Sequence, residues 1–116
     1  MVWTIAFHNE FRNWARSLSR DDQDRINEAL EVLRTVGPVL GRPLVDHVKG
    51  SKMKNLKELR PLGTSIRCLF IFDSQRKAFF LVGGDKKGRW HEWYEESIPI
   101  AESRFKGHFG KQQGSL

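Results

Sequence analysis

The first third of the chain combines one short apolar run with two amphipathic stretches. Residues 2–7 are rich in β-forming side chains and predict a first strand. A helix is predicted to start at His8 or Asn9, because apolar side chains then recur every three or four residues. These side chains are Phe11, Trp14, Ala15 and Leu18.

A second helix is predicted directly after the first. Ser19, followed three residues later by Asp22, gives an N-cap and an acidic first turn, and Gly37-Pro38 ends the element. The apolar stripe between these signals consists of Ile26, Leu30, Leu33 and Val36. Two helices separated by one short turn predict an antiparallel hairpin that covers a sheet.

The middle of the chain predicts a long loop and then three strands. Segment 37–51 contains several glycines and prolines and few periodic apolar residues, which predicts an ordered loop. Strands are predicted over 55–60, 65–72 and 77–83, with turn-forming residues between them. Turns this short imply an antiparallel meander.

Helical spacing returns near the C-terminus, after a loop over residues 84–88. It is carried by Ile98, Ala101, Phe105 and either His108 or Phe109, and residues 110–116 are expected to be disordered. The predicted order β-α-α-β-β-β-α describes a single α+β domain over residues 1–109. We expect an antiparallel sheet with the two N-terminal helices on one face and a C-terminal helix; the other face is expected to stay open for a substrate.

Composition agrees with one packed domain. The 116 residues include 13 aromatic side chains, too many for a disordered chain. No apolar run approaches the roughly 18 residues that span a bilayer, and the first residues lack the features of a signal peptide, so a cytoplasmic protein is expected. The single cysteine, Cys68, excludes a disulfide within the chain and a cysteine-based zinc site, and it is predicted to be a buried thiol.

The net charge of +6 is concentrated in the middle of the chain. Residues 42–89 contain 12 lysines and arginines against four acids, a net charge of +8. Clustered cations favour a polyanion through phosphate neutralisation and counterion release. A solubilising excess of charge explains the same numbers equally well, so composition alone leaves both interpretations open.

Strand alternation groups three charged residues on one face of the predicted sheet. It places Glu58 and Arg60 together, and it points Arg67 away from the apolar face of the next strand. If the hairpin pairs as its turn suggests, these side chains lie side by side. A solvated cross-strand ion pair would account for this arrangement without any catalysis.

The segment after the last predicted strand adds more polar chemistry beside the same sheet edge. It contains Lys86, Lys87, Arg89, Trp90, His91, Trp93 and Tyr94. RNA binding needs such a mixture: cations for phosphates, flat rings for unstacked bases, and groups that move protons. Taken separately, the two indoles are better explained by core packing, and the cations by a basic turn.

Metal-free RNA cleavage needs a base for the 2′-hydroxyl, cations for the phosphate and an acid for the leaving oxygen. Glu58 or neutral His91 is a candidate base, and Tyr94 or His91 a candidate acid. The cations are Arg60, Arg67 and Lys86. Tyrosine and lysine ionise near pH 10, so a basic environment must lower their pKa values for them to act. No cofactor and no metal are expected, because the histidines are scattered and the glycine-rich segment at 83–88 lacks Walker spacing.

Four motifs in order resemble the HigB-like, phage-derived toxins of the RelE/ParE superfamily. They are GPVLGRP at 37–43, NLKELRP at 55–61, RCLFIFD at 67–73 and GGDK at 83–86, continuing through WY at 93–94. The resemblance covers roughly residues 3–109. It implies an mRNA endoribonuclease that acts on ribosome-bound mRNA and inhibits translation, neutralised by a cognate antitoxin protein in a toxin–antitoxin hetero-oligomer.

The resemblance also assigns residue roles. It places the two arginines of the family pattern at Arg60 and Arg67, the basic position after the last strand at Lys86 or Lys87, and the late aromatic at Tyr94. The lysines of RelE would fall on Leu56 and Glu58, and this departure leaves the general base open. Further RNA-binding candidates are Lys52, Lys54, Lys57, Lys87, Arg89, Trp90 and Trp93. A ParE-like gyrase inhibitor and a noncatalytic RNA-binding module are the alternative functions.

Overall fold

The computed structural model describes the backbone of residues 2–114 and the side chains of residues 2–108. Its elements are β1 (Thr4–Phe7), α1 (Asn9–Arg16), α2 (Arg20–Val36), a 3-10 turn (Gly37–Val39), β2 (Val45–His47), β3 (Lys57–Leu59), β4 (Ile66–Phe72), β5 (Lys77–Asp85) and α3 (Trp90–Gly114). The α+β order of elements predicted from the sequence is confirmed, with the strand β2 in addition. The division into a domain over 1–109 and a disordered tail over 110–116 stays a prediction, since residues 115–116 and the side chains from 109 onward lie outside the described residues.

The two N-terminal helices begin at the caps that the sequence indicates. Ser19 Oγ accepts a hydrogen bond from the backbone N–H of Asp22 and caps α2. The imidazole Nδ1 of His8 accepts from the N–H of Glu10 and caps α1 in the same way. Both caps satisfy an N–H that the first helical turn leaves without a partner.

The described strands form one five-stranded sheet in the order β1-β5-β4-β3-β2. The meander β2 to β5 is antiparallel, but β1 pairs parallel to β5, so the sheet is mixed rather than wholly antiparallel. Short turns dictate the direction of the meander strands. No such turn links β1 to β5, because both N-terminal helices and three strands lie between them in the chain.

Strand β2 lies inside the segment expected to be a loop. It has only three residues, and its single buried side chain, Val45, pairs with Leu59 of β3. Three residues are too few to show the alternation that identifies a strand. This strand therefore forms because it pairs with β3, and its own residues do not identify it.

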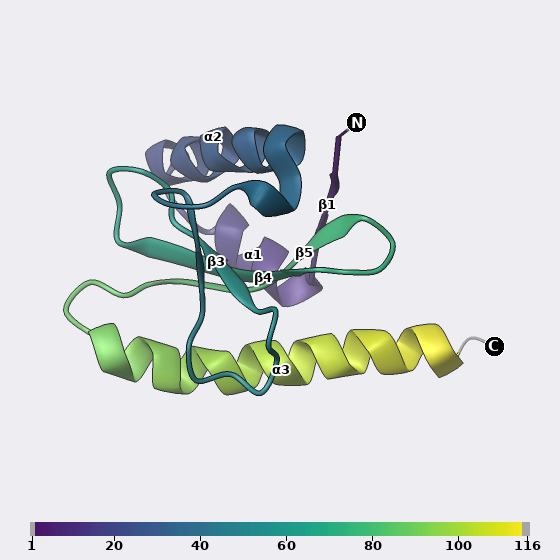
Figure 1. Cartoon of the computed structure of the whole chain (residues 1–116). Helices are drawn as coiled ribbons and strands as arrows, with labels where there is room; N and C mark the ends of the chain where they lie inside the picture. The colour runs from purple at the N-terminus through teal and green to yellow at the C-terminus, as the bar shows by residue number, and fades with distance from the viewer. Residues whose placement is uncertain (1, 115–116) are drawn as a thin grey trace.

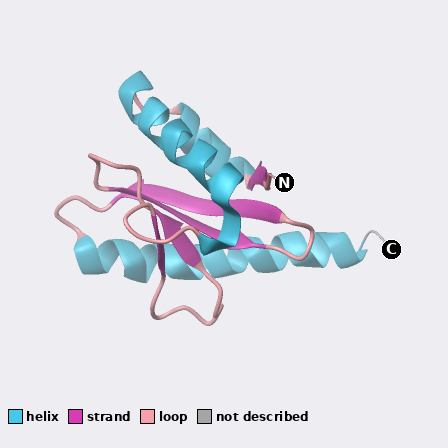
Figure 2. Cartoon of the chain, turned by 45° about the horizontal axis from the view of Figure 1, so that its top comes forward, coloured by secondary structure: helices cyan, strands magenta, loops and turns pink. Residues whose placement is uncertain are grey.

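Helices cover both faces of the sheet (Figures 1 and 2). On one face, Phe11 of α1 and Leu33 of α2 pack against Cys68 and Phe80. The other face was expected to be open, and that expectation is wrong: α3 lies along it. The second core joins Trp93, Ile98 and Ala101 of α3 to Leu56, Leu69, Ile71, Phe79, Leu81 and Val82.

Helix α3 starts at Trp90, eight residues before the first apolar position that predicted it. Its first eight residues mix three glutamates with aromatic and polar side chains, and Pro99 lies inside it, where proline removes a backbone hydrogen bond. Both features hide a helix from a reading of apolar spacing. The outward alternation of Arg67, Leu69 and Ile71 is correct, but these side chains point toward α3 rather than into solvent.

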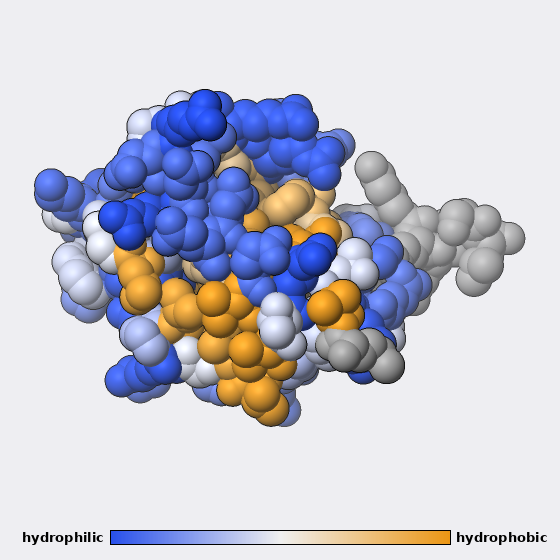
Figure 3. Space-filling model, turned by 90° about the horizontal axis from the view of Figure 1, so that it is seen from above, coloured by the Kyte–Doolittle hydropathy of each residue, from blue (hydrophilic) through white to orange (hydrophobic). Residues whose placement is uncertain are grey.

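The surface on the α2 side is mostly hydrophilic and carries one apolar patch (Figure 3). The exposed apolar side chains of α2 and the neighbouring loops are Val32, Val36, Val39 and Leu62. Among the described residues, no helix has the length and hydropathy that a bilayer crossing requires.

Two adjacent glycines in β5 let the helices approach the sheet closely. A Cβ at Gly83 would overlap the indole of Trp14 in α1, and a Cβ at Gly84 would overlap the indole of Trp93 in α3. Because neighbouring strand residues face opposite sides, each glycine receives a tryptophan from a different layer. The Gly83-Gly84 pair is therefore a packing device and not the start of a loop.

We expect Gly84→Ala to lower the free energy of unfolding by about 1–3 kcal/mol, the usual cost of overpacking a core. The added methyl group displaces Trp93. The matched control is Gly107→Ala in α3, where a Cβ meets nothing within 4 Å and the gain in helix propensity is about 0.5–1 kcal/mol. Urea denaturation measures both variants, and equal stability of Gly84→Ala and the wild type would contradict the packing argument.

Candidate active site

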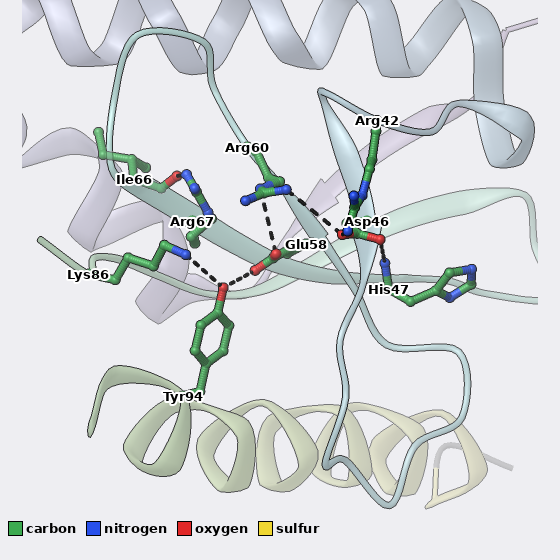
Figure 4. Close-up of polar contacts among 9 residues, drawn as sticks. All are labelled: Arg42, Asp46, His47, Glu58, Arg60, Ile66, Arg67, Lys86 and Tyr94. Carbon is green, nitrogen blue, oxygen red and sulfur yellow. Dashed lines mark hydrogen bonds and ion pairs between the residues drawn. The ribbon is translucent and has the colours of Figure 1, made fainter. Parts of the chain in front are cut away.

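A cluster of polar side chains lies at the end of the sheet where β3, β4 and the end of β5 meet the first turns of α3 (Figure 4). Glu58 in β3 and Arg67 in β4 project to the α3 side, because their neighbours Leu59 and Cys68 fill the opposite core. Lys86 follows β5, and its backbone N–H donates to Ser65. Tyr94 reaches the cluster from α3. The strands β3 and β4, the residue that follows β5, and the helix α3 thus contribute one side chain each.

Tyr94 connects the carboxylate and the amine of the cluster. Its hydroxyl donates to Glu58 Oε1 at 2.6 Å and accepts from Lys86 Nζ at 3.4 Å. Arg60 Nε lies 3.7 Å from the other Glu58 oxygen, Oε2. Glu58 and Lys86 are 6% and 2% exposed, so these contacts are largely shielded from water. Glu58 thus pairs with Arg60, two residues along the chain, and among the described residues no ion pair links it to Arg67 in the next strand.

Arg60 has a second carboxylate partner that the sequence reasoning missed. Asp46 in β2 lies opposite Glu58 in register, and its Oδ2 is 3.8 Å from Arg60 and 2.9 Å from Arg42. The hydrogen bond from Arg42, and then that from the N–H of His47, hold the pKa of Asp46 below its usual value. The sequence does place Arg42 and Asp46 four residues apart, a spacing that allows an ion pair. Only the strand β2, which the sequence did not predict, brings that pair next to Glu58.

Arg67 is a buried cation whose side chain is only partly satisfied. It is 7% exposed, and one guanidinium nitrogen donates to the carbonyl of Ile66 at 2.8 Å. Its Nε is fully buried and finds no hydrogen-bond partner among the described residues. A buried charged donor left unpaired costs free energy, and such donors occur in catalytic sites or where a bound water or ion completes them. This position therefore suits an anion.

Burial is the largest influence on the pKa of Lys86. Desolvation lowers the pKa of its ammonium group, and the positive charge of Arg67 lowers it further, against an opposing effect of Glu58. The ammonium also lies 3.4 Å from the ring centroid of Trp90 and 5.3 Å from that of Tyr94. The expectation that the site lowers this lysine's pKa is confirmed in direction, although burial is a larger cause than the basic surroundings.

The corresponding expectation for Tyr94 is wrong. Burial raises the pKa of its phenol, and the hydrogen bond it donates to Glu58 raises it further. A phenol held this way gives up its proton reluctantly. In the free protein, Tyr94 is therefore a hydrogen-bond donor and not an acid ready to protonate a leaving group.

Two RNA-binding candidates lie in places that do not suit that role. Trp93 is 4% exposed and belongs to the second core, so its indole cannot stack on a base in this conformation. Lys57 faces the opposite side of the sheet, where its ammonium donates to the carbonyl of Pro38 and lies over the ring of Phe72. Trp90, in contrast, is 59% exposed beside Lys86 and keeps a free ring face for stacking.

The remaining candidates surround the cluster without joining its hydrogen bonds. Lys54, Lys87 and Arg89 are exposed, and Arg89 is ion-paired with Glu96 at 2.6 Å. His91 and Lys52 lie together in a groove that Tyr94 also lines. Cys68, in contrast, is fully buried as expected, and burial raises the pKa of its thiol. Among the described residues, no three histidine, cysteine or acidic side chains come close enough together to hold a metal ion.

The chain is similar in sequence to two proteins that are named as putative toxins. It is 46% identical over 105 residues to "Putative toxin HigB3" of Mycobacterium tuberculosis, covering 90% of this chain and 92% of that protein. It is 45% identical over 101 residues to "Putative toxin HigB2" of the same organism, covering 84% of this chain and 50% of that protein.

Two solved structures share the fold. One is a mutant of the E. coli toxin RelE in the free state, with a TM-score of 0.65 and 14% identity over 85% of this chain and 97% of that chain. The other is an archaeal RelE–RelB complex from Pyrococcus horikoshii, with a TM-score of 0.61 and 19% identity over 77% of this chain and 99% of that chain. The model of the family "Phage derived protein Gp49-like" matches residues 13–106. With nearly the whole described domain matched, the chain belongs to the phage-derived Gp49-like family.

Proposed function

We propose that the chain is the toxin of a type II toxin–antitoxin pair and acts as a metal-independent endoribonuclease on ribosome-bound mRNA, inhibiting translation. The observation that carries the proposal is the buried cluster itself. A carboxylate and an amine share the hydroxyl of Tyr94, next to a buried guanidinium whose Nε has no partner among the described residues. Similarity to proteins named as HigB toxins supports the same conclusion.

The cluster supplies each group that cleavage by an internal 2′-hydroxyl needs. Glu58 takes the proton of the 2′-hydroxyl, whose oxygen then forms a bond to phosphorus. The bond from phosphorus to the 5′-oxygen breaks, and Lys86 protonates that oxygen as it leaves. The products are a 2′,3′-cyclic phosphate and a 5′-hydroxyl end. A lowered pKa suits Lys86 to this task, because an acid transfers its proton best when its pKa lies near the working pH.

The two arginines complete the proposed mechanism. Arg67 offers the Nε–H that the described residues leave unpaired, and Arg60 lies 3.7 Å from Glu58. In the proposed mechanism, both stabilise the charge that grows on the phosphate oxygens. Tyr94 must turn its hydroxyl from Glu58 when the 2′-hydroxyl arrives, and it then donates to the substrate. His91 lies outside this hydrogen-bonded set, which favours Glu58 over His91 as the base.

We further propose that a cognate antitoxin protein binds the chain. One structural neighbour was solved in a RelE–RelB complex, which supports a partner of that kind. The exposed apolar side chains of Val36 and Val39, at the end of α2 and in the turn that follows, are a second supporting observation, since exposed apolar surface often marks protein contacts.

Primer extension on mRNA from cells that express the chain tests the nuclease assignment. The wild type is expected to produce cuts within translated codons. Arg67→Ala is expected to reduce cutting by about 10²–10³-fold, the usual cost of removing one donor that stabilises a developing anion. Tyr94→Phe is expected to reduce it as well. Thermal unfolding of both variants shows whether they fold, and metal analysis of the purified, active protein tests metal independence.

Two outcomes would overturn the proposal. If wild-type expression leaves mRNA intact and stalls replication, the chain acts as a ParE-like gyrase inhibitor instead. Binding of RNA with no cuts in any condition would indicate a noncatalytic RNA-binding module.

A further inference from the structure

An open groove of about 490 Å³ runs beside the catalytic cluster. One wall is the segment 49–53, which leaves the sheet between β2 and β3 and lies against α3 (Figure 1). The other wall is α3 itself. The residues that line the groove are Lys49, Gly50, Lys52, His91, Tyr94, Glu95, Ile98, Pro99 and Glu102. Because Tyr94 lines the groove and also contacts Glu58, the groove opens directly from the cluster.

The lining of the groove is chemically mixed. Lys49 and Lys52 supply cations, Glu95 supplies a carboxylate, His91 supplies a flat ring, and Ile98 contributes apolar surface. A site for phosphate alone would contain donors and cations only. A nucleotide presents a phosphate, an apolar ring face and a base edge with both donors and acceptors, so it matches the whole set. The volume also lies in the usual range for small-ligand sites.

The outer wall of the groove is held in place by one carboxylate. Glu102 Oε2 accepts hydrogen bonds from the hydroxyl of Ser51 at 2.8 Å and from the N–H of Lys52 at 2.6 Å. Ser51 Oγ in turn accepts from the N–H of Met53. Gly50 has a φ of 87°, which allows the sharp turn that leads into these contacts. Glu102 thus fixes the segment that carries both lysines, and the wall is formed before any ligand arrives.

We infer that this groove holds the RNA nucleotide next to the scissile phosphate, and that Glu95 reads its base while Lys49 and Lys52 contact its phosphate. The inference rests on the proposed nuclease function and adds a subsite to it. A carboxylate accepts hydrogen bonds from the exocyclic amines of adenine, cytosine and guanine, whereas uracil has carbonyl oxygens at its exocyclic positions, which repel a carboxylate, and donates only from its ring N3–H. The wild type is therefore expected to cut poorly where uracil occupies this position.

The test measures cleavage of a defined mRNA, with and without ribosomes, by the full chain. Lys49→Ala and Lys52→Ala together are expected to raise KM, to leave kcat nearly unchanged, and to reduce the slope of log KM against log salt by about 0.7 per lysine. Glu95→Gln is expected to reduce discrimination against uracil by about fivefold, the lower end of the effect of one base contact. The matched control is Lys106→Ala, an exposed lysine of α3 outside the groove.

The positioning role of Glu102 has its own readout. Glu102→Ala frees the segment 49–53 and is expected to raise KM as the double lysine variant does, with little change in kcat. Glu102→Gln keeps one acceptor oxygen and is expected to restore part of the affinity. Thermal unfolding of each variant separates loss of the groove from loss of the fold.

The outcomes distinguish the two proposals. If the wild type cuts RNA but the groove variants match Lys106→Ala in KM, salt slope and base preference, the groove inference is overturned and the nuclease assignment stands. If the wild type cuts no RNA in either condition, the proposed function itself fails.

Discussion

Replacing Lys86 by methionine is expected to lower the rate of RNA cleavage by about 10²–10⁴-fold, the usual contribution of one acid or base. The methionine side chain keeps most of the volume of the lysine stem but carries no proton to transfer. Because Lys86 is 2% exposed and lies over Trp90, a substitution that fills the same space is needed to preserve packing. Single-turnover cleavage by the purified variant measures the loss.

The pH profile identifies the acid more sharply than the rate alone. Cleavage requires the protonated amine, so activity falls as pH rises through the pKa of Lys86. Burial and the charge of Arg67 hold that pKa below the ordinary value of 10.5, and the alkaline limb of the wild type is therefore expected below pH 10.5. A limb governed by Tyr94 would lie above the ordinary phenol value of 10.0, because burial and Glu58 raise its pKa.

Lys86→Arg separates charge from acidity. A guanidinium keeps its proton up to about pH 12, so this variant is expected to bind RNA, to cleave slowly and to lose the alkaline limb. Lys106→Met is the control, since Lys106 is an exposed α3 lysine, and it is expected to retain the wild-type profile. An unchanged alkaline limb in Lys86→Arg would show that Lys86 is not the acid.

The sequence predicts those features whose causes are local. The cap at Ser19, the apolar stripe of α2 and the alternation along β4 depend on residues close together in the chain. All three are present, except that the last residue of the stripe, Val36, is 41% exposed. The same alternation places Glu58 and Arg67 on one face of the sheet. Two members of the cluster can therefore be grouped from the order of residues alone.

The errors concern features whose causes are distant in sequence. The direction of β1 and the existence of β2 depend on partners across the sheet. The burial of Trp93 follows from its contact with Gly84 across the layers, and the role of Asp46 follows from its register with Glu58. Periodicity within one segment contains none of this information.

The pKa of Tyr94 shows the same limit in chemical terms. The sequence shows many cations near it, and cations alone would lower the pKa of a phenol. The fold instead buries the ring and directs its hydroxyl at a carboxylate, and these two effects exceed the effect of Arg67 and Arg60. The sequence shows correctly which charged residues are present, but burial and the short distance to Glu58 decide that the pKa of Tyr94 rises.

Glu58→Gln is expected to reduce cleavage by about 10²–10⁴-fold, because it removes the proposed proton acceptor while keeping the size of the side chain. The amide oxygen still accepts from Tyr94, so the hydrogen bond of 2.6 Å has a replacement and the fold is expected to persist. Near-UV circular dichroism, with signals from the tryptophans, checks that the packing is intact.

Tyr94→Phe is the informative comparison for this variant. It removes the phenol that occupies Glu58 in the free protein but leaves the carboxylate, so it is expected to retain more activity than Glu58→Gln if the carboxylate is the base. The two changes together should then cost little more than Glu58→Gln alone, since both act on one hydrogen-bonded unit. Glu28→Gln, an exposed change on α2, is the control for removing a negative charge. A Glu58→Gln enzyme that cleaves at the wild-type rate would move the role of base to His91.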